Sequence, residues 1–341
     1  MLYSTYLGGT TGYSTMTAVA ADAQGNAYVT GQTFASDYPH TSGLPNGSAS
    51  GGVGAVSAVF FAKISPAGDK IAYAGGLTAT TRICTGGSSC FLSPLATYGV
   101  SIAVDPAGNA YIAGNTGGRG LPTTPGAFLP DGVGAFAAKV NSSGTGMVYV
   151  TLMDGATYGS GTFVGATTSV FAIAVDAAGD AYLAGSTSDP SFPTTAGAFQ
   201  TKLADSKTTT PPPPDGFVAK LNPTGNAIVW ATYLGGSAAD QAQTIALDSA
   251  GNVWVSGTTQ STDFPVSAGF PGGTDFLAEF NHSGSVLLNA RYPSGSVATA
   301  LAVDSSGLVH ASGANGLVSL FTPIQLAAPR IYGIANAAGG H

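Results

Sequence analysis

Side chains able to act as acids, bases, nucleophiles or metal ligands are scarce in this chain. Glu279 is the only glutamate, and the 341 residues include four histidines and two cysteines. Five of the sixteen aspartates recur at one repeated position, where turn capping accounts for them: Asp22, Asp105, Asp176, Asp248 and Asp304. Six loop aspartates remain as candidates for hydrolytic chemistry: Asp37, Asp131, Asp154, Asp189, Asp240 and Asp263. No pair of them has the spacing typical of a two-carboxylate glycosidase.

The histidines form no pattern that predicts a metal site or a catalytic triad. They are His40, His282, His310 and His341, and only His40 is expected in a long loop. The sequence has no Asp-rich calcium loop and no glycine-rich phosphate loop followed by a helix. Lysines that recur in one strand position are expected to extend along a sheet edge: Lys63, Lys139 and Lys220. We therefore predict no catalytic residue, no metal, no cofactor and no enzymatic activity.

The two cysteines, Cys84 and Cys90, both lie in the loop TRICTGGSSCF. Their spacing suits a small loop disulfide; two free thiols and a metal contact are the alternatives, and a CxxC metal motif is absent. A disulfide, few lysines and loops rich in Ser, Thr and Gly favour an extracellular location. The N-terminus enters a strand at once, without a signal peptide. We therefore expect a mature or excised piece of a larger exported protein.

The composition excludes two classes of partner. The net charge is −7, and the ten Lys and Arg residues are scattered singly, so no basic patch is available for nucleic acid. No apolar run approaches the roughly 18 residues that a membrane span requires. Charged residues make up only 8%, alongside 50 Gly and 20 Pro. This mixture favours many short strands and tight turns.

The elements that position these side chains are five copies of one phrase. The copies are TAVAADAQGNAYVTG (17–31), VSIAVDPAGNAYIAG (100–114), FAIAVDAAGDAYLAG (171–185), QTIALDSAGNVWVSG (243–257) and TALAVDSSGLVHASG (299–313). Two apolar runs around an Asp-x-x-Gly turn predict two antiparallel strands joined by a tight turn. Aromatic side chains recur at one position and are expected in the core: Tyr28, Tyr111, Tyr182, Trp254 and, as its replacement, His310. Repetition on this scale predicts a closed repeat fold.

A third strand follows each hairpin, and a fourth follows in the first four copies. The third strands are predicted at 60–64, 136–140, 217–221, 276–280 and 317–321, and the fourth at 71–77, 147–153, 228–234 and 286–292. Four antiparallel strands in chain order make one propeller blade. We therefore predict an all-β fold, a five-bladed β-propeller of four-stranded antiparallel blades.

The fifth copy lacks a fourth strand, and the N-terminus supplies a candidate. LYSTYLGG (2–9) matches VWATYLGG (229–236) almost position for position. We expect residues 2–8 to pair into the fifth blade and close the ring, which leaves no unpaired edge inside it. The propeller domain would then span residues 1–322, with 323–341 as a C-terminal tail or the start of a further domain.

All long insertions fall on one predicted face of the propeller. They occupy 32–59, 78–99, 115–135, 154–169, 186–216, 235–242 and 258–275. Four of these loops place an apolar residue before proline: Tyr38, Leu121, Phe192 and Phe264. We expect that residue to pack the loop onto its blade. The loop-bearing face is the candidate functional surface.

Aromatic and sparse polar side chains on this face could line the mouth of a central channel. They are Tyr13, Tyr38, Arg82, Tyr98, Arg119, Asp154, Tyr158 and Phe163. Such a set suits a glycan or protein ligand. The favoured prediction is a non-catalytic extracellular module for binding or display. One alternative is a structural subunit that assembles with copies of itself into a surface array or fibre. The other is a glycan-active hydrolase that uses the loop aspartates.

Four recurring phrases carry a family resemblance: YSTYLGG, the AVDxAGNAY hairpin, FPTTxGAF and DGFVAKLNPTG. They resemble the bacterial β-propeller repeat known as SBBP, along nearly the whole of residues 2–321, and NHL-repeat propellers more weakly. The resemblance implies a propeller in a secreted or cell-surface bacterial protein, with no common activity. That family is usually described as seven-bladed, whereas the repeats here predict five. The tail at 327–341 resembles the opening of a further C-terminal domain.

Overall fold

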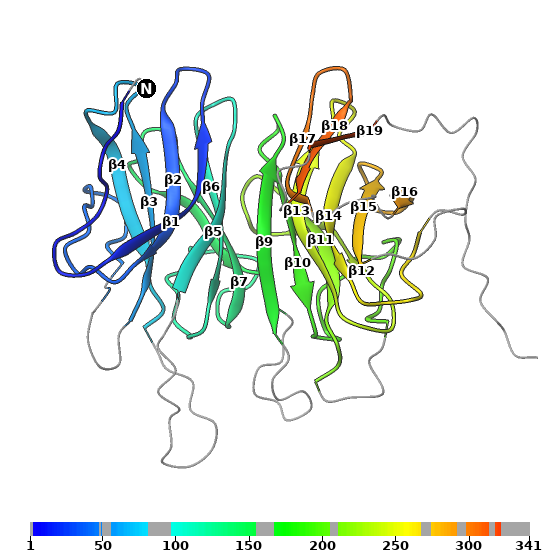
Figure 1. Cartoon of the computed structure of the whole chain (residues 1–341). Helices are drawn as coiled ribbons and strands as arrows, with labels where there is room; N and C mark the ends of the chain where they lie inside the picture. The colour runs from blue at the N-terminus through cyan, green and yellow to red at the C-terminus, as the bar shows by residue number, and fades with distance from the viewer. Residues whose placement is uncertain are drawn as a thin grey trace, which may run out of the picture.

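The described residues form nineteen β-strands and contain no helix. The computed structural model describes residues 3–47, 49, 56–80, 97–154, 167–204, 211–266, 274–291, 298–313 and 318–321. The strands group into five antiparallel sheets, here called blades 1 to 5 (Figure 1). All-β blades of the predicted kind are therefore confirmed.

Blades 1 to 4 each contain four strands that pair in chain order. Blade 1 has β1 (Ser14–Ala21), β2 (Ala27–Thr33), β3 (Ala58–Ile64) and β4 (Ile71–Leu77). Blade 2 has β5 (Thr97–Val104), β6 (Ala110–Thr116), β7 (Gly134–Val140) and β8 (Met147–Leu152). Blade 3 has β9 (Thr168–Val175), β10 (Ala181–Thr187), β11 (Asp215–Leu221) and β12 (Ile228–Leu234). Blade 4 has β13 (Asp240–Leu247), β14 (Val253–Thr259), β15 (Asp275–Phe280) and β16 (Leu287–Arg291).

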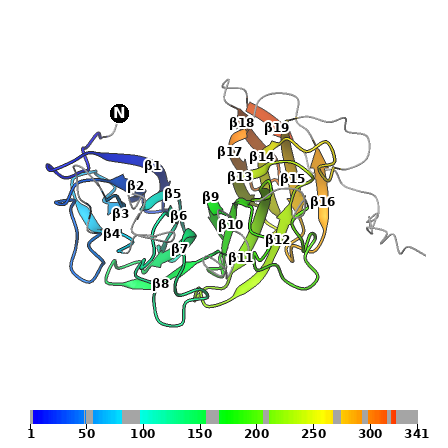
Figure 2. The same ribbon diagram turned by 90° about the horizontal axis from the view of Figure 1, so that it is seen from below.

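Blade 5 has three strands, β17 (Ala298–Val303), β18 (Val309–Gly313) and β19 (Val318–Phe321). The predicted pairing of the N-terminal segment with β19 is absent, because residues 3–9 form no strand. They run along blade 1, whereas β19 lies at the other end of the row of blades (Figure 2). The predicted closure is therefore not present in this structure.

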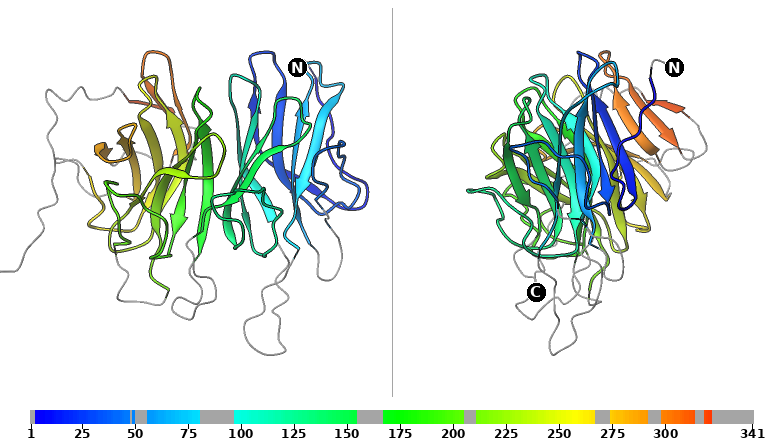
Figure 3. Two further views of the ribbon diagram at one scale, coloured as in Figure 1. Left: turned by 180° about the vertical axis from the view of Figure 1, so that it is seen from behind. Right: turned by 90° about the vertical axis from the view of Figure 1, so that its left-hand side faces the viewer.

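The blades stand side by side in an arc whose innermost strands are the first strand of each blade. Contacts between blades run through the series β1, β5, β9, β13 and β17. Seen from below, blades 1 and 5 are the two ends of the arc (Figure 2). Views from behind and from the side show the strands of neighbouring blades running roughly alongside one another (Figure 3). The core lies between blades, in clusters that join residues of adjacent sheets.

The repeated aromatic position is buried as predicted. Tyr28, Tyr111, Tyr182 and Trp254 are all at most 2% exposed. Each of these side chains lies on the second strand of its blade, where it packs into a contact with the next blade. Position-equivalent aromatics therefore stabilise the junctions between blades.

The apolar residue before proline packs each loop onto its blade, also as predicted. Tyr38, Leu121, Phe192 and Phe264 are buried. The ring of Phe264 stacks on Phe276 of β15 with centroids 4.5 Å apart, and Phe192 lies 4.7 Å from Phe217 of β11. These contacts hold each long loop against a strand of its own blade.

Candidate functional site

The two ends of the blades differ in the length of their connections. The turns between first and second strands and between third and fourth strands form one end, here called the turn face. In Figure 1 the β1–β2 and β17–β18 turns of this face are at the top. The longer connections between second and third strands, and between blades, begin and end at the opposite end, the loop-bearing face. This arrangement follows from antiparallel pairing in chain order.

The aspartates of the turn face cap their hairpin turns. Asp105 Oδ1 accepts the Asn109 backbone N–H at 2.9 Å, and Asp105 Oδ2 accepts Asn109 Nδ2 at 2.7 Å and Tyr111 Oη at 2.9 Å. Burial acts to raise the pKa of Asp105, but the hydrogen bonds from Asn109 and Tyr111, with the charge of Lys139, lower it overall. Comparable caps form at Asp22, Asp176, Asp248 and Asp304. The repeated aspartates are therefore structural.

The repeated lysines cover the buried tyrosines. Lys63, Lys139 and Lys220 place Nζ 4.8 to 4.9 Å from the centroid of a tyrosine ring on the adjacent second strand. Lys220 also forms an ion pair with Asp180, with 2.9 Å between Nζ and Oδ2. These cation–π contacts, each worth about 0.5–2 kcal/mol, account for the lysines without a chemical role.

The predicted ligand contacts are distributed unevenly over the loop-bearing face. Tyr13 and Tyr98 are exposed near the beginnings of β1 and β5, and the Tyr13 ring lies against Phe34. Arg119 forms an exposed ion pair with Asp131, with 3.0 Å between Nη1 and Oδ2. Tyr38, by contrast, is 6% exposed and packs on Phe60, so it serves the core rather than a ligand.

The other predicted contacts are buried or lie outside the described residues. Asp154 is buried and accepts the Thr168 hydroxyl at 2.9 Å. Outside the described residues lie Arg82, Tyr158 and Phe163, together with Cys84 and Cys90 of the predicted disulfide. Among the described residues, the predicted contacts that are exposed on this face are Tyr13, Tyr98 and Arg119, the last in its ion pair with Asp131.

Two of the loop aspartates accept hydrogen bonds from the segments that lead into the first strands of blades 1 and 4. Asp37 accepts the hydroxyls and the backbone N–H groups of Thr10 and Thr11, and these bonds hold its pKa well below the usual range. Asp263 accepts the N–H and hydroxyl of Ser237, and its pKa is also lowered. Since both carboxylates are held in equivalent turns, they are structural anchors of the linkers.

Two further aspartates form a buried acidic pair that sequence reasoning did not connect. Asp215 begins β11, Asp240 begins β13, and both are 0% exposed. A Cβ placed on Gly235 would lie 2.5 Å from Asp215 Oδ1 and 2.7 Å from Asp240 Oδ2, so the two carboxyls flank this glycine. One signal was available: Asp240 stands where the other first strands begin with Ser14, Thr97 and Thr168.

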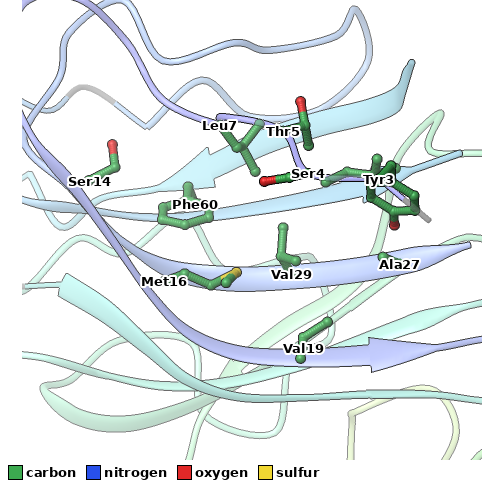
Figure 4. A pocket seen from close by; sticks show the side chains of 11 residues that line it. Tyr3, Ser4, Thr5, Leu7, Ser14, Met16, Val19, Ala27, Val29 and Phe60 are labelled. Atoms are coloured by element: carbon green, nitrogen blue, oxygen red, sulfur yellow. The ribbon is translucent and has the colours of Figure 1, made fainter. Parts of the chain in front are cut away.

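A groove of about 400 Å³ lies between the N-terminal segment and blade 1 (Figure 4). Its apolar wall includes Val19, Val29 and Phe60, and its opposite side is formed by Tyr3 and Leu7. The groove contains no titratable side chain other than Tyr3. Sequence reasoning missed it because it exists only where a blade lacks its neighbour.

Neither a metal-binding cluster nor a membrane-spanning helix was found among the described residues. No cluster of three or more His, Cys, Asp or Glu side chains is arranged to hold a metal ion in the part of the chain that the structure describes. Over the same residues, no helix has the length and apolar character needed to cross a membrane.

Comparison with known proteins gives a repeat family and a fold neighbour. The β-propeller repeat SBBP matches residues 2–39, 87–122 and 229–265. One similar solved structure is described as "Structure of Dos1 propeller"; it has 9% sequence identity and a TM-score of 0.41, covering 92% of this chain and 71% of that chain. No curated protein matches the sequence. Three segments of the chain are thus similar to the β-propeller repeat SBBP, and the antiparallel four-stranded blades agree with that similarity.

Proposed function

We propose that this protein is a non-catalytic extracellular module that binds or displays a glycan or protein ligand through its loop-bearing face. The observation that carries the proposal is the difference between the two ends of the blades. Short, aspartate-capped turns form one end, whereas every long connection begins and ends at the other. Long loops on a rigid scaffold are where binding residues usually lie.

The side chains available on this face suit recognition better than hydrolysis. Tyr98 lies exposed on an innermost strand, and Arg119 with Asp131 offers an exposed charged pair. An aromatic surface with few polar groups suits stacking on a sugar ring or a peptide side chain. Of the loop aspartates proposed for a hydrolase, Asp37 and Asp263 are held by linker amides. These bonds support the non-catalytic assignment.

A binding screen of the intact chain against glycans and peptides tests the proposal. Any ligand found should bind Tyr98→Ala at least about fivefold more weakly, since loss of an aromatic contact typically costs about 1–3 kcal/mol. Val229→Ala, on the exposed outer strand β12, is the matched control and should bind like the native protein. Binding unaffected by Tyr98→Ala, or hydrolysis that disappears in Asp131→Asn, would refute the assignment.

We further propose that the ring closes, with the N-terminal segment as the fourth strand of blade 5. Tyr73, Tyr149 and Trp230 of the outer strands each pack over a turn glycine of the next blade: Gly144, Gly225 and Gly284. Tyr3 packs in the same way over Gly68 of blade 1. The N-terminal segment therefore already occupies an outer-strand position relative to blade 1.

The groove of blade 1 supports the same proposal. Val29 and Phe60 correspond by strand register to Val255 and Phe276 of blade 4, which pack against side chains of blade 3. Val19 is 62% exposed, whereas its counterpart Ile245 is 8% exposed. An apolar sheet face of this kind is expected to be covered. Blade 5, which has three strands among the described residues, is the complementary element.

A designed disulfide tests closure. By correspondence with the Ala231–Ala219 pair of β12 and β11, Ser4 should lie opposite Ser319. In a background with both native cysteines replaced by serine, Ser4→Cys with Ser319→Cys should form an intramolecular disulfide. Ser4→Cys with Leu320→Cys, one residue out of register, is the control. A monomeric product supports closure, and no disulfide refutes it.

The assembly alternative is favoured by the same unfilled positions. A three-stranded blade at one end and an unpaired segment at the other can complete each other between copies of the chain. In the cysteine experiment, disulfide-linked dimers and higher oligomers would support a structural subunit of an array or fibre. Size-exclusion chromatography of the reduced protein would then show concentration-dependent association.

A further inference from the structure

The junction between blades 3 and 4 contains two carboxyl groups that form no ion pair with any described residue. Asp215 Oδ2 accepts Gln200 Nε2 and the Ala204 backbone N–H, each at 2.9 Å. Asp240 Oδ2 accepts the Gly236 N–H at 2.7 Å and the Ser261 hydroxyl at 2.8 Å. The second oxygen of each carboxyl, Oδ1, is buried without a hydrogen-bond partner.

Two ionised carboxylates in this position would be costly. Both side chains are fully buried, and no ion pair joins either of them to a lysine, arginine or histidine of the described residues. The titratable groups whose charges act on Asp215 are Asp240 and Asp263, and Tyr233 faces Asp215 in turn. All of these are acidic, so each additional negative charge is unfavourable.

A proton on one of the two carboxyls supplies a donor where the buried oxygens Asp215 Oδ1 and Asp240 Oδ1 have no partner. A carboxylic acid supplies one O–H donor, whereas two carboxylates supply only acceptors. Like charges in a shared site raise one pKa strongly. Burial, followed by the charge of Asp240, raises the pKa of Asp215 to about 7, and burial also raises the pKa of Asp240.

Comparison with the other blades shows what the pair replaces. At the position of Asp240, the first strands of blades 1 and 3 place a hydroxyl against a second-strand threonine, as in Ser14–Thr33 and Thr168–Thr187, with 2.8 Å between oxygens. At the position of Asp215, blade 1 has Ala58 and blade 2 has Gly134. The acidic pair is therefore particular to the junction of blades 3 and 4.

We propose that Asp215 and Asp240 share one proton and thereby make the junction of blades 3 and 4 sensitive to pH. While it is bound, the proton removes one negative charge from the junction and supplies an O–H donor there. Its loss leaves two adjacent buried negative charges, which push β11 and β13 apart at the loop-bearing end. The roots of the loops at Ala204 and Gly236 are bonded to these carboxyls, so they respond with them.

The direction in which pH changes the stability follows from the difference between the native and unfolded pKa values of Asp215. The native pKa of Asp215 lies above its usual value of 3.8, so between about pH 4 and 7 the native chain holds a proton that the unfolded chain has released. The stability gained from this proton is complete below the unfolded pKa and is lost as the pH rises through about 7.

Thermal unfolding of the full chain at pH 5.5 and pH 8 tests the proposal. Asp215→Asn keeps the shape and supplies a donor, and Asp240→Thr restores the hydroxyl of the other blades. Each should raise the melting temperature at pH 8 by several degrees and reduce the difference between the two pH values. Asp69→Asn, an exposed aspartate of the turn face with one side-chain hydrogen bond, should leave that difference unchanged.

Infrared spectroscopy supplies an independent measurement. A protonated-carboxyl band should be present in the native protein at pH 6 and absent in Asp215→Asn. If calcium, magnesium or manganese instead raises the native melting temperature saturably at pH 8, and fails to do so in Asp240→Thr, the pair binds a cation and the proposal is wrong. Variants less stable than the native protein at pH 8 would also overturn it.

Discussion

At the scale of single residues, the chain uses its few charged groups mainly to hold turns. Sixteen aspartates in a weakly charged protein suggest chemistry, but the best-placed ones accept hydrogen bonds from backbone amides, as Asp105 and Asp263 do. A carboxylate that accepts several N–H groups is stabilised in its charged form and is a poor general acid. Residue type therefore predicts little about function here until the partners of each residue are known.

Replacing the cap at Asp105 tests this structural role. Asp105→Ala removes three hydrogen bonds, from the Asn109 backbone, the Asn109 side chain and the Tyr111 hydroxyl. We expect a loss of about 2–4 kcal/mol in the free energy of unfolding, measured by urea denaturation at pH 7. Because the native pKa of Asp105 is lowered, its contribution is present above pH 4 and is lost as the pH falls. Equal loss at pH 7 and pH 2 would contradict this explanation.

At the scale of elements, the third-to-fourth strand turn is also the surface on which the preceding blade packs. Gly144 has a φ of 68°, and its Cα faces the ring of Tyr73 from blade 1. Glycine serves two purposes at this position: it adopts positive φ, and it leaves room for the ring. One residue thus links turn geometry to packing between blades.

A pair of glycine substitutions separates these two purposes. Gly126 also has a positive φ, 79°, but a Cβ there would meet nothing within 4 Å. Gly126→Ala should therefore cost only the conformational strain, about 1 kcal/mol. Gly144→Ala should cost at least about 2 kcal/mol more, since the new methyl overlaps the Tyr73 ring. Chemical denaturation of both variants measures the difference, and equal losses would mean that the ring moves aside freely.

At the scale of the whole molecule, the blades form an arc with two unmatched ends. Adjacent blades bury their faces against each other, yet β1 remains largely exposed at one end. The N-terminal segment covers part of blade 1 and leaves the groove of Figure 4 (Figure 4). A closed ring would bury this face, and so would a second copy.

Substitution of Val19 measures whether that face is covered in solution. Val19→Asp should be nearly neutral, within about 0.5 kcal/mol, if the arc stays open. In the closed ring proposed above, a buried unpaired charge should destabilise the protein by about 3 kcal/mol or more. Val148→Asp, on the exposed edge of β8, is the control and should be tolerated. Equal stability of the two variants would count against closure.

The sequence by itself determined the blades: their strands, their order, the caps at Asp22 and its equivalents, and the docking of Phe192 and Phe264. These features depend on residues close in the chain or on positions repeated in the blades. A feature recognised in one repeat can therefore be predicted in the others. Only the tertiary structure decided the position of the N-terminal segment and the meeting of Asp215 with Asp240. Both depend on how one blade is placed against the next, and contacts between blades leave no periodic signal when they occur only once.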